Sequence, residues 1–122
     1  MIEHRGRESG RLYRTVVEVA GRPPTGDGEW FVVSGFGPRA DWYRNIRAGN
    51  LVAIWLGSRR YRASVRFVEP EEAADVMIGY ETAHPKAARF LAVELGLAHD
   101  GTSEGRLRLM RQVPMVAFSP HC

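Results

Sequence analysis

Short segments of β-branched and aromatic residues recur along the first 68 residues, and glycine- or proline-rich stretches separate them. This punctuation predicts strands rather than helices. Segment 59–68 alternates most clearly, because its apolar residues fall on one face and its arginines on the other, which predicts one buried and one wet side. The predicted strands are residues 13–20, 29–34, 51–56 and 59–68, and residues 4–14 are predicted to be a charged loop that leads into the first strand.

Two turns and one helix are predicted between these strands. Residues 21–28 contain two prolines and three glycines and would close a hairpin between the first two strands. Apolar residues at helical spacing predict a helix over residues 40–48, with Gly49 as the residue that ends it. Gly57 and Ser58 fit a type II′ turn between the last two strands, since glycine occupies its first central position.

The second half of the chain changes to helical patterning. Residues 69–80 begin with Pro70 followed by acidic residues, as the first turn of a helix does, and residues 85–95 predict a second helix. Residues 98–105 are polar and predict a loop. The chain then closes with a predicted strand over residues 107–118, where Pro114 indicates an edge position or a bulge.

Hairpin-connected strands with a few short helices favour a small antiparallel barrel over a doubly wound parallel sheet. The predicted fold class is therefore α+β and mainly β. The chain has 122 residues, and no repeat, low-complexity stretch or linker divides it. We expect a single domain over residues 1–122.

Charge is spread unevenly along the chain. The formal net charge is +3, but residues 1–66 hold 12 arginines against 6 acids. A basic half indicates an anionic partner, and arginine is the residue that grips phosphate and carboxylate groups in bidentate fashion. The partner classes left open by charge alone are a nucleotide-like cofactor, an acidic metabolite and nucleic acid.

Cysteine usage and hydropathy predict the compartment. Cys122 is the only cysteine, so no internal disulfide forms, and no Cys/His spacing predicts a metal site. No signal peptide is evident and no apolar run approaches the length that spans a bilayer. These features predict a protein of the cytoplasm.

Two segments carry candidate anion-binding groups. Residues 34–40 place a glycine loop and Arg39 between a strand and a helix, which presents backbone N–H groups to an anion. The same spacing also fits a turn that binds nothing. The arginines between residues 5 and 14 form either a clamp for phosphates and carboxylates or a solvated arm. No histidine pairs with a serine or cysteine in a catalytic motif, so difficult chemistry would belong to a cofactor.

Three segments together resemble the deazaflavin-dependent nitroreductase family, split-barrel proteins that use coenzyme F420. Residues 6–10, GRESG, are similar to the family's Gly-Arg-Lys-Ser/Thr-Gly segment. Residues 33–37, followed by residues 41–46, resemble its Ser-x-Gly-Gly loop and its x-Trp-Tyr-x-Asn-Leu helix. Residues 112–116 resemble its closing strand with an Ile-Pro or Val-Pro pair. The segments occur in the family's order and spacing, and the resemblance covers most of the chain.

The resemblance implies a split β-barrel oxidoreductase that transfers a hydride between reduced coenzyme F420 and an organic acceptor such as a quinone or a nitro compound. The protein would contribute orientation and exclusion of water rather than a nucleophile. No catalytic residue is assigned, and Tyr80 is a candidate proton donor by residue type alone. The implied cofactor-binding residues are Arg7, Ser9, Arg14, Val16, Val17, Ser34, Gly35, Phe36, Gly37, Arg39, Trp42, Tyr43 and Asn45. For Trp42, packing in the core is an equal alternative.

Two departures from the family pattern reduce the expected grip on phosphate. Glu8 stands where the family usually has lysine, and Phe36 takes a place often held by a basic residue. Other ligands for the same barrel stay open: FMN, haem or a lipid.

Two further alternatives concern partners. A non-catalytic basic β-barrel would bind another anionic ligand or nucleic acid. Arg60, Arg62 and Arg66 alternate with the aromatic residues of their strand, which favours a solvated face over a platform for stacked bases. The apolar strand 51–56 would face either an internal core or the interface of a homodimer.

Overall fold

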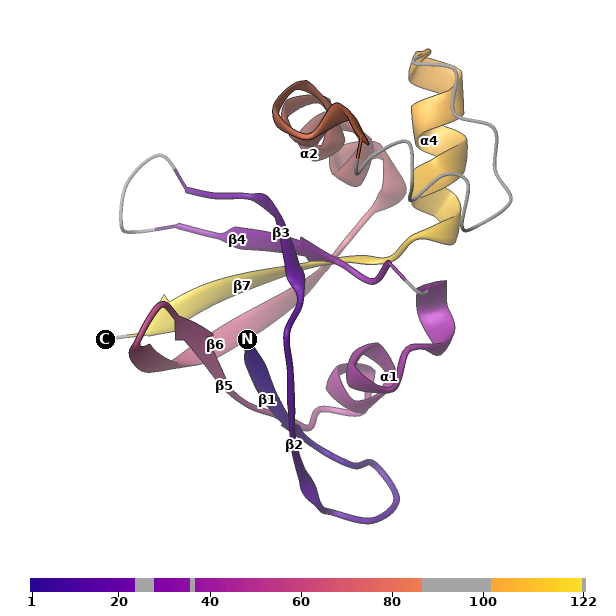
Figure 1. Cartoon of the computed structure of the whole chain (residues 1–122). Helices are drawn as coiled ribbons and strands as arrows, with labels where there is room; N and C mark the ends of the chain where they lie inside the picture. Colours follow the sequence, from indigo (N-terminus) through magenta and orange to yellow (C-terminus); the bar gives the residue numbers. More distant parts are fainter. Residues whose placement is uncertain (24–27, 36, 87–101, 122) are drawn as a thin grey trace.

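Every neighbouring pair of strands in the sheet is antiparallel, and the sheet curls into a half-barrel (Figure 1). The computed structural model describes residues 1–23, 28–35, 37–86 and 102–121. The strand order is β2-β1-β5-β6-β7-β4-β3, and three α-helices accompany the sheet in this part of the chain. The fold is therefore α+β and mainly β, as predicted.

The elements have the following bounds. The strands are β1 (Ile2–Arg5), β2 (Leu12–Thr15), β3 (Glu18–Gly21), β4 (Trp30–Val33), β5 (Leu51–Leu56), β6 (Arg59–Val68) and β7 (Met115–His121). The helices are α1 (Asp41–Arg47), α2 (Pro70–Ala83) and α4 (Ser103–Gln112), and a 3-10 turn, η1, covers Gly37–Arg39.

Strand β6 joins the two halves of the sheet. Its first three residues pair with β5 and its last seven pair with β7. Because one strand passes from one partner to another, the sheet bends around it. The predicted alternation along β6 is confirmed, and its residues fall into two sets. The partly buried set is Tyr61, Ala63, Val65 and Phe67, and the exposed set is Arg60, Arg62, Ser64 and Arg66.

An outer core lies between the sheet and helices α2 and α4 (Figure 1). Its nine buried residues are Ala20, Val33, Ala73, Met77, Tyr80, Leu109, Met110, Val113 and Met115. Helix α2 begins as predicted, with Pro70 in its first turn and acidic residues directly after it. The outer core therefore fixes the two longer helices to one face of the sheet.

An inner core fills the other face of the sheet. Helix α1 contributes Trp42 and Ile46, which share one helical face at a spacing of four residues. Alternation along β7 sends Met115 to the outer core and Val116 to the inner core, so this strand is buried on both faces. The seven buried residues of the inner core are Ile2, Val32, Trp42, Ile46, Ile54, Val116 and Phe118.

The predicted closing strand over residues 107–118 is wrong in its first half, because helix α4 occupies the chain up to Gln112. Thr102 caps this helix: its Oγ1 accepts a hydrogen bond from the Gly105 N–H at 3.0 Å. The predicted loop over residues 98–105 therefore ends before Ser103. The predicted edge position or bulge at Pro114 is also wrong, since Pro114 lies just before β7, and β7 pairs without a register shift with both β4 and β6. Most of the predicted helix over residues 85–95 lies outside the described residues.

The beginning of the chain also differs from its prediction. Residues 4–14 are not one loop, because β1 and β2 form a hairpin in which His4 lies opposite Tyr13. The predicted strand over residues 13–20 is two strands, β2 and β3, interrupted at Val16 and Val17. This interruption lets β2 pair with β1 at one edge of the sheet while β3 pairs with β4 at the other.

Several local predictions are confirmed. The predicted strands at residues 29–34 and 51–56 correspond to β4 and β5, and the predicted hairpin between the first two strands corresponds to β3 and β4. Helix α1 ends before Gly49, whose φ of 85° only glycine adopts at low cost. Gly57 has a φ of 63° while Ser58 does not enter the positive region, as a type II′ turn requires.

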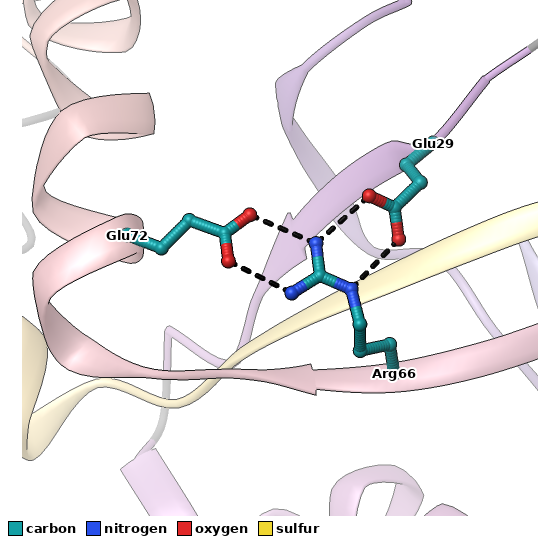
Figure 2. A network of polar contacts seen from close by, with 3 residues as sticks. All are labelled: Glu29, Arg66 and Glu72. Atoms are coloured by element: carbon teal, nitrogen blue, oxygen red, sulfur yellow. Dashed lines mark hydrogen bonds and ion pairs between the residues drawn. The ribbon is translucent and has the colours of Figure 1, made fainter.

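One arginine ties helix α2 to the sheet. The Arg66 guanidinium donates two hydrogen bonds to each of two carboxylates, those of Glu29 and Glu72, at 2.8–2.9 Å (Figure 2). We call this arrangement the Arg66 fork. Hydrogen bonds from Arg66 hold the pKa of both carboxyl groups below their usual value. The fork thereby links the residue just before β4, strand β6 and the first turn of α2 at the surface.

Candidate functional site

A cavity of about 460 Å³ lies where the β1–β2 hairpin faces helix α1. Strand β1 and the loop after it form one side of the cavity, β2 forms another, and α1 supplies the rest. The lining residues are His4, Gly6, Arg7, Glu8, Ser9, Tyr13, Arg14, Thr15, Asp41, Trp42 and Asn45. Its size is typical of pockets that hold a small molecule or part of a cofactor.

A continuous chain of hydrogen bonds crosses the wall of this cavity. Thr15 Oγ1 lies 2.9 Å from His4 Nε2, and His4 Nδ1 lies 2.9 Å from Asn45 Nδ2. Asn45 Oδ1 accepts hydrogen bonds from the Arg7 backbone N–H at 3.1 Å and from the Arg7 guanidinium at 2.8 Å. We call these four residues the Thr15–His4–Asn45–Arg7 relay.

The relay fixes the protonation of His4. Both donors of Arg7 meet the same atom of Asn45, so that atom is the amide oxygen and the amide nitrogen faces His4. His4 Nδ1 must then accept, which leaves the proton on Nε2, where it donates to Thr15. His4 is only 2% exposed, and burial lowers the pKa of its imidazole, an effect that the carboxylate of Asp41 offsets only in part. The neutral imidazole is therefore the form that this site holds.

Two arginines and two carboxylates bring formal charge to the cavity. Arg7 is the more enclosed arginine, with its side chain 24% exposed, and its guanidinium also reaches Asp41 at 3.4 Å. The Asp41 side chain is 83% exposed, so water screens its charge more than that of Arg7. Glu8 and Arg14 are both exposed at the cavity. The charge that the protein holds in a defined position here is the positive charge of Arg7.

Arg14 connects the cavity to a buried carboxylate on the opposite face of β1. Glu3 is 2% exposed, and it accepts hydrogen bonds from the Trp55 indole and from two nitrogens of Arg60. Arg14 lies 3.7 Å from the same carboxylate. Hydrogen bonds from Arg60 and Trp55 hold the pKa of Glu3 below its usual value, so Glu3 is ionised at neutral pH. Arg14 lies opposite Glu3 in the pairing of β1 with β2, and its side chain is 60% exposed, so its guanidinium stays open to solvent beside Glu3.

Aromatic rings form the apolar part of the cavity. The Tyr13 ring stacks on His4 with centroids 5.8 Å apart and planes inclined by 24°. Trp42 lines the cavity while its bulk belongs to the inner core. The packing of Trp42 in the core is confirmed, and the same residue also lines the cavity.

Five of the residues implied by the family resemblance line the cavity, and the others lie elsewhere or outside the described residues. The five are Arg7, Ser9, Arg14, Trp42 and Asn45. Val17 and Tyr43 pack against the inner core, and Val16 is 83% exposed. Arg39 is exposed on η1, and Phe36 lies outside the described residues.

Two residues of the predicted glycine loop, Ser34 and Gly37, hydrogen-bond to each other. Ser34 is fully buried, and its hydroxyl donates to the Gly37 carbonyl at 2.6 Å. The Gly37 N–H in turn donates to the Ser34 carbonyl at 2.9 Å. Ser34, Gly35 and Gly37 do not line the cavity. This arrangement leaves the Ser34 hydroxyl committed to the turn.

Sequence reasoning missed His4, Tyr13, Thr15 and Asp41 as residues of the site. The feature of the sequence that could have predicted these residues is the hairpin formed by β1 and β2. Had residues 6–10 been interpreted as a hairpin loop, the pairing of its strands would have placed Tyr13 opposite His4 and put Thr15 on the same face two residues later. Tyr80, the candidate proton donor, lies in the outer core instead, and its hydroxyl donates to Glu18 at 2.9 Å. Burial, together with Glu18, raises the pKa of Tyr80 to about 12.

The described part of the chain lacks two other kinds of feature. No helix there is both long and apolar enough to cross a membrane. No group of three or more His, Cys, Asp or Glu side chains gathers among the described residues in a way suited to a metal ion. A scan against protein-family models and a search of curated proteins find no match to this chain.

Proposed function

We propose that this chain is a split β-barrel oxidoreductase that binds coenzyme F420 in the cavity and transfers a hydride between the reduced cofactor and an organic acceptor such as a quinone or a nitro compound. The observation that carries the proposal is the position of Arg7. A guanidinium held by a buried amide stands in one cavity with the rings of Tyr13 and Trp42. Such a site suits a ligand that joins an anionic group to a flat ring.

The donor set of the cavity fits this cofactor class. F420 carries a phosphate and a tail of carboxylates, which guanidinium groups and hydroxyls bind well. Arg7 and Arg14 would hold these anionic groups, and the Ser9 hydroxyl would add a hydrogen bond. Tyr13 and Trp42 would flank the ring, since both offer aromatic surface to the cavity.

The chemistry supplied by the bound deazaflavin is the transfer of a hydride from its ring carbon. The protein's own residues would bind and orient. The relay keeps Arg7 in one position, so that part of the cost of ordering the site is met before the ligand arrives. His4 uses both ring nitrogens within the relay, which makes it a positioning group rather than a general base.

Nucleic acid is the main competing partner, and the arginines on the exposed face of β6, Arg60, Arg62 and Arg66, would be its binding surface. Arg60 pairs with Glu3, and Arg66 is held by Glu29 and Glu72. These pairs satisfy two of the three guanidinium groups that would otherwise contact phosphates. FMN stays the alternative small ligand, because it also joins a phosphate to a flat ring.

The test is a fluorescence titration of purified protein into oxidised F420 and, separately, into FMN. We expect saturable binding of F420, weakened about tenfold or more by Arg7→Gln, because a hydrogen bond to a charged group is worth about 1.5–3 kcal/mol. Arg62→Gln removes an exposed arginine from β6, away from the cavity, and should change little. Binding of FMN alone would move the function to flavin chemistry. Binding of neither ligand would overturn the proposal.

A further inference from the structure

The donors and acceptors of the relay fit together in only one arrangement, so the orientation of each residue is set by its neighbours in the relay. Asn45 and His4 are each 2% exposed, so water offers no substitute partner for their polar atoms. The amide of Asn45 has one oxygen, which already accepts twice from Arg7, and its nitrogen faces His4. The orientation of Asn45 is therefore determined jointly by Arg7 and by the unprotonated Nδ1 of His4.

A second proton on His4 is incompatible with this arrangement. Protonated Nδ1 would face the NH₂ group of Asn45, placing two donors against each other. Turning the amide over would present its oxygen to His4 but its nitrogen to the two donors of Arg7. In the first case the hydrogen bond between His4 and Asn45 is lost. In the second case both hydrogen bonds from Arg7 are lost, and Arg7 loses the group that holds it.

The charged and titratable groups around His4 come from each element packed against it. Helix α1 presents Asp41, whose carboxylate favours the protonated imidazole, while burial disfavours it more strongly. Strand β5, which also pairs with β1, places the apolar Leu51 opposite His4. The remaining groups, from β2 and from the loop between β1 and β2, are Tyr13, Arg14, Arg7 and Glu8.

We propose that His4 is a pH-sensitive positioning residue: only its neutral form lets Asn45 hold Arg7 at the cavity, so the affinity for an anionic ligand falls as the pH falls. The identity of that ligand rests on the proposed function. The direction in which affinity changes with pH distinguishes this role from that of a histidine in direct contact with the ligand. A histidine that merely stood beside an anion would bind it more tightly when protonated, and affinity would rise at low pH.

The experiment measures F420 affinity from about pH 8 to about pH 5 for the unmodified protein and three variants. His4→Asn places an amide oxygen near the position of Nδ1, so it accepts from Asn45 without titrating. Asn45→Asp supplies a carboxylate that accepts from Arg7 and from a protonated His4 alike. His121→Gln is the control, because His121 is exposed on β7 and bonds only Ser64 in the described structure. Circular dichroism at each pH verifies that every variant stays folded.

We expect the unmodified protein and His121→Gln to lose affinity about tenfold or more toward low pH, in line with the loss of one charged hydrogen bond. His4→Asn should lose this dependence, so that its affinity stays constant across the range whatever its value at high pH. Asn45→Asp should lose or invert it. Titration of the ligand itself is common to all four proteins and cancels in the comparison. Affinity that rises toward low pH, or a dependence that survives in His4→Asn, would overturn the proposal.

A readout without ligand separates this proposal from the proposed function. Nitrogen NMR of the four histidines reports the tautomer of His4, with His4→Asn identifying its signals. We expect the proton on Nε2 at neutral pH, and a change in the Arg7 backbone N–H signal that follows the titration of His4. A failure of F420 to bind would sink the cofactor assignment alone. Protonation of Nδ1 at neutral pH, or an Arg7 signal indifferent to His4, would sink the relay alone.

Discussion

The two faces of the sheet bury different kinds of side chain. The outer core is a cluster of aliphatic side chains and Tyr80, whose hydroxyl reaches the exposed Glu18 at its margin. Beside the inner core, by contrast, the protein buries an imidazole and an amide in direct contact. Buried polar groups stabilise a fold less than apolar groups of the same size, unless every hydrogen bond is made. The outer core therefore contributes mainly to stability. On the side of the sheet that carries the cavity, the buried polar groups stabilise the fold less, but they hold Arg7 in position.

The largest expected effect belongs to the outer core. Leu109→Ala removes a side chain that is 1% exposed, and we expect a loss of about 2–5 kcal/mol in the free energy of unfolding. Ligand affinity under folding conditions should stay the same, since Leu109 does not line the cavity. Urea denaturation measures the first quantity and the F420 titration the second. Ile78→Ala, at a position 49% exposed, is the matched control. Equal destabilisation by both variants would contradict the assignment of the outer core.

The next effect belongs to the relay. Asn45→Ala leaves His4 Nδ1 and the Arg7 donors without their partner, at an expected cost of about 1–3 kcal/mol in unfolding free energy. The affinity for F420 should fall as well. Asn45→Ala therefore lowers both the free energy of unfolding and the affinity, whereas Leu109→Ala lowers only the free energy of unfolding. Urea denaturation and the F420 titration at the same pH are the measurements. If Asn45→Ala bound F420 as tightly as the unmodified protein, the functional role of the cavity face would be wrong.

A smaller effect belongs to the Arg66 fork. Its carboxylates have pKa values below the usual range, so their ionised forms stabilise the folded state. That contribution is complete above the ordinary pKa of glutamate and disappears as the pH falls through the lowered values. Glu72→Gln should cost about 1 kcal/mol at neutral pH, because the group is 43% exposed and screened, and the cost should vanish in acid. Thermal melts at neutral and acidic pH measure both, and a pH-independent cost would contradict the electrostatic origin.

The smallest expected effect is an increase in affinity for F420. Glu8→Lys replaces the acid at the cavity with the residue that the resembled family carries, and we expect F420 to bind a few-fold more tightly. Asp75→Lys changes the net charge equally at an exposed position on α2, outside the cavity, and controls for long-range attraction. Titrations at low and moderate salt compare the two variants. An equal gain from both would show that net charge alone acts.

The sequence predicted those elements whose patterns have one interpretation. β6 alternates from Arg60 to Phe67, and α1 is bounded by Asp41 and Gly49, so both were predicted within about a residue. Helix α4 was missed because Leu107 and Leu109 fit a period of two, while the deciding signal was the side-chain cap at Thr102. In the cavity, Arg7 and Asn45 were named from the family resemblance, but no histidine was assigned a role from the sequence. The role of His4 depends on Asn45, 41 residues away, a contact that only the folded chain creates.

A half-barrel does not close on itself, and this leaves β2 and β3 as the two outermost strands of the described sheet. Unpaired strand edges invite other chains to add to them, which leads to aggregation. Both edges here carry features that resist it: each strand has only four residues, β2 contains Arg14, and the register of β3 shifts between Val19 and Gly21. The hairpin that builds one wall of the cavity is thus also one edge of the sheet, and Arg14 both interrupts that edge and lines the cavity. An apolar substitution at Arg14 would expose the edge and weaken the site in a single step.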